Sequence, residues 1–158
     1  MGVVKQSYET VESHLSTLDE GYDSFKVNQT TVAATSDRYE RERERACAGS
    51  VDVYTKVRND DGEILHVRED EDVVLPSTRT TSERFERTAF DTVEKQTGVE
   101  CRVEGIDQAT ILGIRDGNKE RETVYRLAVV FEATHWSGSP EETAVWRSDP
   151  NRPPLVYG

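Results

Sequence analysis

The stretch Leu75–Val99, LPSTRTTSERFERTAFDTVEKQTGV, decides the fold that this sequence predicts. Its apolar residues Phe85, Ala89 and Val93 recur at a spacing of four, which places them on one face of a helix. Gly98 follows them at a point where a helix commonly ends in a left-handed residue. The stretch therefore predicts a turn, an amphipathic helix and a glycine stop before a new strand.

The start of this helix carries the pattern of a capping box, TTSE, from Thr80 to Glu83. In such a box the first side chain accepts a hydrogen bond from the backbone N–H of the Glu, and the Glu carboxylate bonds back to the first residue. We therefore predict Thr80 as the N-cap and Glu83 as its partner. An ion pair with Arg87 is the alternative use of the Glu83 carboxylate.

The same stretch resembles the Nudix box, G-x5-E-x7-R-E-U-x-E-E-x-G-U, in which U is an aliphatic residue. The spacing fits without a gap, but only part of the chemistry is kept. The pattern is matched at Glu83, Val93, Gly98 and Val99 and changed at Ser77, Asp91, Thr92, Lys95 and Gln96. On these residues the chain is identified as a member of the Nudix (MutT-like) hydrolase superfamily with a degenerate box.

The flanking segments agree with this resemblance. Val51–Val57 alternates with period two, and Glu63–Arg68 reads as the return strand of a hairpin whose turn carries Asp-Gly. Val124–Ala133 is the most apolar segment, with apolar residues toward both sides, so both faces of this strand are expected to be covered. Glu142 precedes Trp146 by four residues, as in the family's late segment.

The resemblance implies an α/β fold, a Nudix-type α/β/α sandwich with a mixed β-sheet. We expect residues 50–158 to form the Nudix-fold domain and residues 1–49 to form an N-terminal helical extension packed on the same domain. Within the extension, residues 8–20 predict a helix, residues 22–34 a short strand and residues 37–48 a charged helix capped by Ser36 or Asp37.

The resemblance also implies a metal site, which this sequence has altered. In the family, carboxylates of the box helix hold Mg²⁺, which neutralises a diphosphate and activates water. The corresponding residues are Thr92, Lys95 and Gln96, whose charges sum to +1 where the family's three Glu sum to −3. The local charge thus changes by four units. Since one charge pair about 4 Å apart is worth about 4 kcal/mol at an effective dielectric of about 20, this change strongly disfavours a divalent cation. We therefore predict that Mg²⁺ and the catalytic residues are lost.

Two basic side chains are the candidate ligand-binding residues. Arg79 precedes the helix, where free N–H groups favour a phosphate, although an exposed side chain in a polar loop is the plainer alternative. Lys95 replaces a metal-binding Glu, and Asp91 replaces the box Arg. We predict that the Lys95 ammonium occupies the space of the metal, held by Asp91 and by Glu83.

Composition limits the partners and the compartment. The chain has 31 Asp and Glu against 20 Lys and Arg, and its net charge of −11 disfavours contacts with nucleic acid phosphates. Because only 5 of the basic residues are Lys, the surface is typical of a salt-adapted, halophilic cytosol, the alternative being an ordinary acidic protein. The sequence contains no run of 18 apolar residues, so we expect no membrane span. Cys47 and Cys101 form no CxxC, so we expect a reduced, cytoplasmic setting.

Three functions stay open at this point. The first, which we favour, is a non-catalytic Nudix-fold protein that binds a nucleotide-like small molecule or a protein partner. The second is a hydrolase of nucleoside diphosphate derivatives with relocated carboxylates, for which Glu83, Asp91, Glu141 and Glu142 are the candidates. The third is a structural or assembly domain whose N-terminal extension forms a homodimer.

Overall fold

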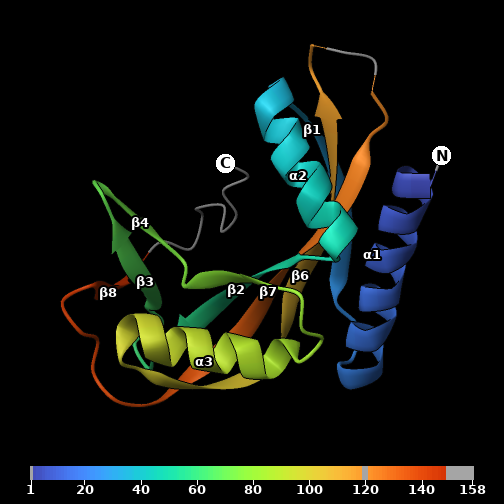
Figure 1. Cartoon of the computed structure of the whole chain (residues 1–158). Helices are drawn as coiled ribbons and strands as arrows, with labels where there is room; N and C mark the ends of the chain where they lie inside the picture. Colours follow the sequence, from blue (N-terminus) through green and yellow to red (C-terminus); the bar gives the residue numbers. More distant parts are fainter. Residues whose placement is uncertain (1, 119–120, 149–158) are drawn as a thin grey trace. The chain divides into compact units, whose positions relative to one another are not determined.

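The computed structural model of the chain describes residues 2–118 and 121–148. Within these ranges helices and strands are mixed along the chain (Figure 1). They are α1 (Gly2–Gly21), β1 (Lys26–Ala34), α2 (Ser36–Ala48), β2 (Val51–Arg58), β3 (Ile64–Glu69), β4 (Asp72–Val74), β5 (Ser77–Thr80), α3 (Phe85–Thr97), β6 (Glu100–Asp116), β7 (Val124–Ser137) and β8 (Ala144–Arg147). None of the described helices has the length and apolar composition needed to cross a membrane. The prolines expected to end regular structure, Pro150, Pro153 and Pro154, lie outside the described residues.

Contacts between residues group the chain into two compact units. Unit 1 holds the N-terminal segment through Asp52, together with Arg79–Glu83 and Gln108–Val129. Unit 2 holds Val53–Thr78, Arg84–Asp107 and the chain from Val130 onward. The predicted extension, residues 1–49, therefore falls in unit 1 together with segments from much later in the sequence.

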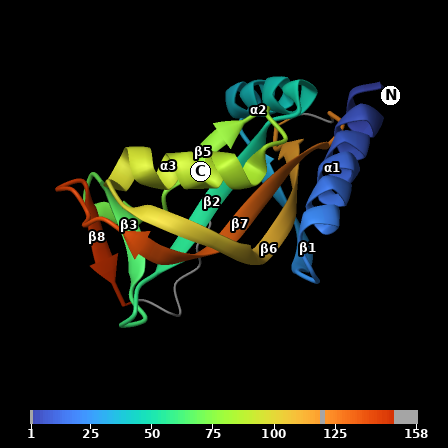
Figure 2. The same cartoon turned by 90° about the horizontal axis from the view of Figure 1, so that it is seen from below.

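The strands form a mixed β-sheet, which confirms the α/β class predicted from the sequence. In unit 1 the strand order is β1-β6-β7, and β1 runs parallel to β6. In unit 2 the order is β6-β7-β2-β3-β4, with β5 on β2 and β8 on β3. The pairs of β3 with β2, β4 and β8 are antiparallel. Figure 2 shows β1 lying beside β6.

The extension contributes a strand to the sheet of unit 1. All nine residues of β1 pair with β6, from Lys26 with Gln108 to Ala34 with Asp116. The strand predicted at residues 22–34 is thus present, but the sequence did not indicate its partner. The first helix was predicted too short, since α1 already begins at Gly2.

The second helix has a different cap from the two that we predicted. Thr35 is the N-cap of α2, and its side chain accepts a hydrogen bond from the backbone N–H of Arg38. Ser36 and Asp37 lie inside the first turn, where the negative Asp37 carboxylate stabilises the helix by its attraction to the positive end of the helix dipole. Gly49 ends the helix with a φ of 73°, a conformation that L-residues other than Gly rarely adopt.

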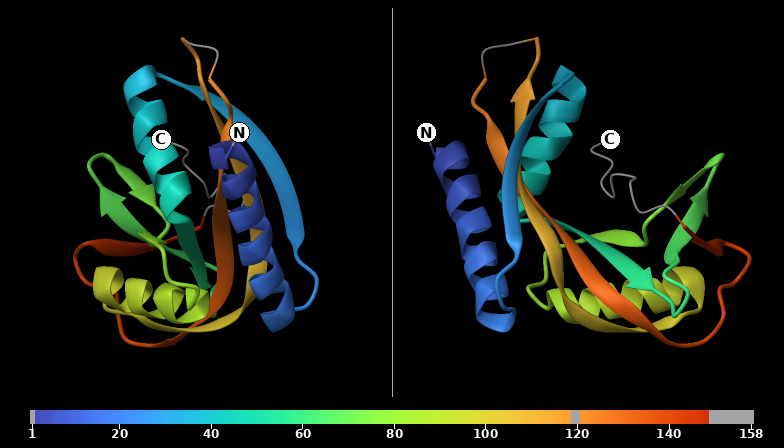
Figure 3. Two further views of the ribbon diagram at one scale, coloured as in Figure 1. Left: turned by 45° about the vertical axis from the view of Figure 1, so that its right-hand side comes forward. Right: turned by 180° about the vertical axis from the view of Figure 1, so that it is seen from behind.

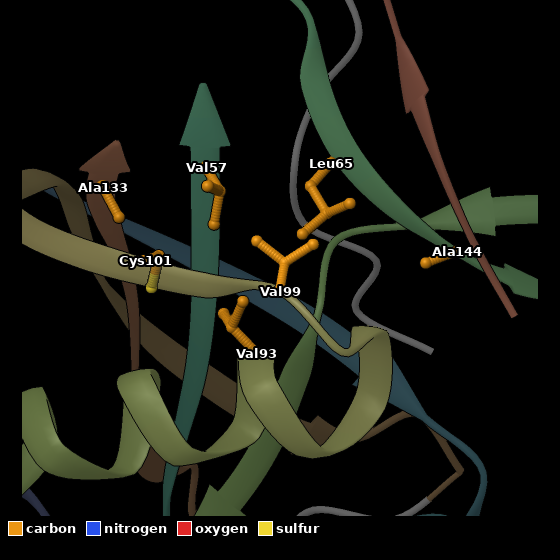
Figure 4. Packing of buried hydrophobic residues seen from close by; sticks show 7 residues of the cluster. All are labelled: Val57, Leu65, Val93, Val99, Cys101, Ala133 and Ala144. Carbon is orange, nitrogen blue, oxygen red and sulfur yellow. The ribbon is translucent and has the colours of Figure 1, made fainter. Parts of the chain in front are cut away.

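Helix α3 covers the core of unit 2 as the spacing of its apolar residues predicts. Phe85, Ala89 and Val93 are buried, and Gly98 closes the helix with a φ of 79°. Figure 4 shows Val93 pointing from the helix toward Val99. The cluster around them consists of Val57, Leu65, Val93, Val99, Cys101, Ala133 and Ala144. On β7, the residues from Leu127 to Phe131 are all buried, so this strand is covered on both faces, as predicted.

Candidate functional site

The loop before α3 does not form the predicted capping box. Ser77–Thr80 is strand β5, which pairs with β2, so the backbone of Thr80 belongs to the sheet rather than to a helix. The Thr80 hydroxyl accepts a hydrogen bond from the N–H of Ser82, which tightens the turn. The helix begins four residues later than expected, at an N-cap, Arg84, whose side chain makes no capping hydrogen bond.

Glu83 stands at the Glu of the box pattern but serves another contact. Its carboxylate accepts a hydrogen bond from the Thr17 hydroxyl of α1 at 3.4 Å, and both residues belong to unit 1. It neither caps α3 nor pairs with Arg87. The Arg87 guanidinium instead binds Asp91 at 3.2 Å, one helical turn away. The predictions that Glu83 caps the helix or pairs with Arg87 were therefore wrong.

The structure does not form the predicted clamp around Lys95. Lys95 is exposed in the last turn of α3 and forms no ion pair with any residue that the structure describes. Asp91, which we expected to hold it, is also exposed and is bound by Arg87. Near the C-terminus of the helix, a cation such as Lys95 is favourable because the dipole is negative there.

Gln96 makes the most specific contact among the altered box positions. Its side-chain N–H donates to the carbonyl of Ser77 at 2.8 Å, and its side-chain oxygen accepts from the N–H of Ser77 at 3.3 Å. The two hydrogen bonds join the last turn of α3 to the first residue of β5 within unit 2. The Thr143 hydroxyl donates to the backbone carbonyl of Gln96 at 3.1 Å, which adds the segment before β8 to the same point.

These side chains do not fit the magnesium ion that the resemblance to the Nudix box implies. Mg²⁺ takes oxygen ligands, usually from one or two carboxylates. Thr92 is buried on the core side of α3, the Gln96 oxygen is bound by Ser77, and Lys95 is a cation. Among residues 2–118 and 121–148, no group of three or more His, Cys, Asp or Glu side chains is placed to hold a metal ion. We assign no catalytic step to a metal here.

Arg79, the second candidate ligand-binding residue, is part of an ion-pair network in unit 1. Its Nε donates to Asp52 at 3.0 Å, and the same Asp52 oxygen lies 3.0 Å from Nη1 of Arg126. Arg126 also donates from Nε to Glu42 at 2.6 Å, and Arg45 binds the other Glu42 oxygen at 2.7 Å. The side chains of Arg126 and Glu42 are each only 4% exposed, so the network is anchored in the core.

Burial alone would lower the pKa of Arg126, because it disfavours the charged guanidinium. The neighbouring carboxylates of Asp52 and Glu42 outweigh this effect and raise the pKa. Arg126 therefore stays charged and links α2, β2 and β7. Our sequence reasoning missed this residue, and the signal was a single Arg inside the apolar run Val124–Ala133.

The carboxylates proposed as replacements for the box glutamates are not gathered around α3. Glu141 and Glu142 are exposed. The Glu141 side chain lies against Gly98 at the C-terminal end of α3. A Cβ added to that glycine would come within 2.8 Å of Glu141 Cγ. Asp91 is occupied by Arg87. Within unit 2, these acids therefore do not converge on one point of the box helix.

Comparisons with known proteins returned structural neighbours only. No protein-family model and no curated protein matches the chain. The MutT protein from Methanosarcina mazei Go1 aligns with a TM-score of 0.46 and 20% identity over 62% of this chain and 75% of its own. An ADP-ribose pyrophosphatase from Streptococcus suis 89-1591 aligns with a TM-score of 0.46 and 16% identity over 67% of this chain and 78% of its own.

A further neighbour is a longer chain. A candidate oxidoreductase from Sinorhizobium meliloti 1021 aligns with a TM-score of 0.46 and 16% identity over 71% of this chain, which spans only 35% of that protein. At these identities and TM-scores, the similarity assigns neither an activity nor a substrate to the chain.

Proposed function

We propose that this chain is a Nudix-fold protein that has lost Mg²⁺-dependent pyrophosphate hydrolysis and binds a nucleotide-like ligand or a protein partner without cleaving it. The observation that carries the proposal is the pair of hydrogen bonds between Gln96 and Ser77. The family holds its metal with a carboxylate at the position of Gln96. In this chain the same position fastens the helix to the preceding strand.

The chemistry of the amide supports this change of role. A Gln side chain offers both a donor and an acceptor, so it satisfies the C=O and the N–H of Ser77 together. An ionised Glu only accepts and would face the Ser77 carbonyl oxygen without a proton to share. A side chain that joins two backbone groups in this way is held toward β5, which supports a structural role for Gln96 in place of metal binding.

The alternative, a hydrolase with relocated carboxylates, lacks a comparable observation. Asp91 is paired with Arg87, and Glu141 lies against the helix end at Gly98. A salt-rich cytoplasm is the proposed compartment, supported by the net charge of −11 and the small number of lysines.

The test is an assay for cleavage of ADP-ribose and nucleoside triphosphates at high salt, with Mg²⁺ or Mn²⁺, alongside titration calorimetry with Mg²⁺ alone. We expect no hydrolysis above the rate without protein and no tight Mg²⁺ binding. Thermal shift with the same nucleotides then reports binding, because a ligand of the native state raises its melting temperature. Robust cleavage by the unmodified protein would overturn the proposal.

A matched variant separates loss of the ligands from loss of the scaffold. The triple substitution Thr92→Glu, Lys95→Glu, Gln96→Glu restores the three carboxylates of the family's pattern. We expect the triple variant to bind Mg²⁺ more tightly than the wild type, because oxygen ligands replace a cation and two neutral groups. Equal Mg²⁺ affinity in both proteins, with a triple variant whose cooperative unfolding shows that it is folded, would mean that these three positions do not control the metal.

A further inference from the structure

A shallow groove of about 280 Å³ lies in unit 1 between α1 and the start of β1. Both views in Figure 3 show α1 running beside β1. The groove is lined by Glu12, Leu15, Ser16, Asp19, Phe25 and Val27. Val27 is 49% exposed and is one of two strongly exposed large apolar residues in the described part of the chain. The lining of the groove therefore combines apolar side chains with the two acidic residues Glu12 and Asp19.

The strand beside the groove is an open edge. In the described part of the chain, β1 pairs with β6 on one side and stands at the end of the strand order. Natural edge strands are commonly protected by charges, prolines or bulges. The segment Val27–Ala34 carries no charge and no proline, and its register with β6 is continuous, so it has no bulge. The outer backbone groups of β1 are suited to pairing with another strand.

The acidic residues that line the groove determine which kind of added strand it can bind. Glu12 and Asp19 stand two helical turns apart, about 10 Å, a length that an extended segment covers with about three residues. The neighbouring cation, Lys26, alternates away from Val27 to the other face of the strand. A second copy of this chain would bring a net charge of −11 to an acidic groove, whereas a basic segment would be attracted.

We propose that this groove binds an extended, basic segment of a protein partner. The segment adds as a strand to the free edge of β1 and rests an apolar side chain on Phe25 and Val27. Its Lys or Arg side chains meet Glu12 and Asp19. In this mode the main-chain hydrogen bonds supply affinity and the side chains supply the choice of partner. This inference does not depend on whether the box helix retains activity.

The experiment uses the full chain and a short fluorescent peptide of alternating arginine and valine. Binding is followed by anisotropy at the high salt of the hydrolysis assay, where a Debye length of about 3 Å at 1 M leaves only ion pairs in direct contact. We expect saturable binding that Glu12→Lys with Asp19→Lys weakens at least tenfold. The matched control is Asp60→Lys with Glu71→Lys, which changes the net charge equally at exposed positions of unit 2. Equal weakening in both double variants would mean general attraction to an acidic protein and would overturn the proposal.

Two further measurements test the strand and the occupant. N-methylation of one alternate set of peptide residues removes the N–H groups that face β1, so we expect it to abolish binding, while methylation of the other set leaves binding intact. Equal effects of the two sets would rule out strand addition. Sedimentation of the protein alone, over a range of concentrations, should show a monomer. A dimer dissociated by the Glu12 and Asp19 double variant would assign the groove to a second copy instead.

Discussion

Gln96 binds both backbone groups of Ser77, the N–H at 3.3 Å and the carbonyl at 2.8 Å, although the two residues stand 19 positions apart. One side chain thereby fixes the distance between the start of β5 and the end of α3. Ser77 is half-buried, so its backbone groups depend in part on these partners in place of water. This contact is specific enough to be tested by a change of a single atom.

Replacing that amide with a carboxylate, Gln96→Glu, should lower the free energy of unfolding by about 1–3 kcal/mol, because the Ser77 carbonyl loses its donor and faces a negative charge. Urea denaturation measures the change. Gln29→Glu is the matched control, an identical substitution at an exposed position of β1, and should stay within about 0.5 kcal/mol of the wild type. Equal effects of the two substitutions would deny the contact between Gln96 and Ser77 a role in stability.

Removing the buried cation, Arg126→Met, should destabilise the protein by about 3–5 kcal/mol, because it leaves Glu42 and Asp52 without their shared partner in the core. Arg79→Met is the control. Arg79 binds the same Asp52, but its side chain is 41% exposed, so its loss should cost about 1 kcal/mol or less. Thermal and urea unfolding of both variants check the order, and a larger loss for Arg79 would contradict the network as described.

Gly138→Ala should cost more stability than Gly62→Ala. Both glycines have positive φ, 85° and 78°, so each alanine bears the strain of about 1–2 kcal/mol that a left-handed residue carries. At Gly62 the added Cβ meets open space, whereas at Gly138 it comes within 2.7 Å of the backbone oxygen of Gly98. We expect an extra loss of about 1–3 kcal/mol at Gly138. Urea unfolding of the two variants side by side tests this. Equal losses would mean that Gly138 does not lie this close to the backbone of Gly98.

Alkaline pH should destabilise the protein through Cys101. Burial raises the pKa of the Cys101 thiol from 9.0 to about 11. Between these values the unfolded chain releases the thiol proton while the folded chain keeps it, so stability is complete below about pH 9 and falls as pH rises toward 11. Unfolding free energies across this range should fall more steeply for the wild type than for Cys101→Ala. Parallel pH profiles would assign the loss to other groups, such as Tyr39, whose pKa burial also raises.

The sequence predicts the local features of this fold well because neighbouring residues decide them. The apolar face of α3 and its glycine stop follow from a spacing of four and from the freedom of Gly98 at positive φ. The hairpin of β2 and β3 follows from alternation around an Asp-Gly turn. In each case one short segment contains all the information, so the structure confirms the element to within a few residues.

The capping box failed because a distant segment competes for the same residues. Thr80 and Glu83 have the correct spacing, but the pairing of β5 with β2 takes the backbone of Ser77–Thr80 into the sheet. The Gln96 contact was hidden for a related reason. Nothing within a few residues of Gln96 indicates that its partner is a backbone group at Ser77. The candidate site could thus be located by its box pattern, while the use of each side chain depended on the fold.

Because β1 pairs in parallel with β6, the first strand is synthesised well before the strand that it pairs with. The Thr110 hydroxyl donates to Asn28 across 82 positions of sequence, and the backbone partners of β1 are equally remote. At about 5–20 residues per second, a nascent chain waits roughly 4 to 16 seconds between making the first strand and making its neighbour. For that interval an uncharged stretch of Asn, Gln, Thr and Val emerges from the ribosome with no strand to join. On crowded polysomes this would favour aggregation between neighbouring nascent chains. A chaperone that shields about the first forty residues would then raise the yield of native protein.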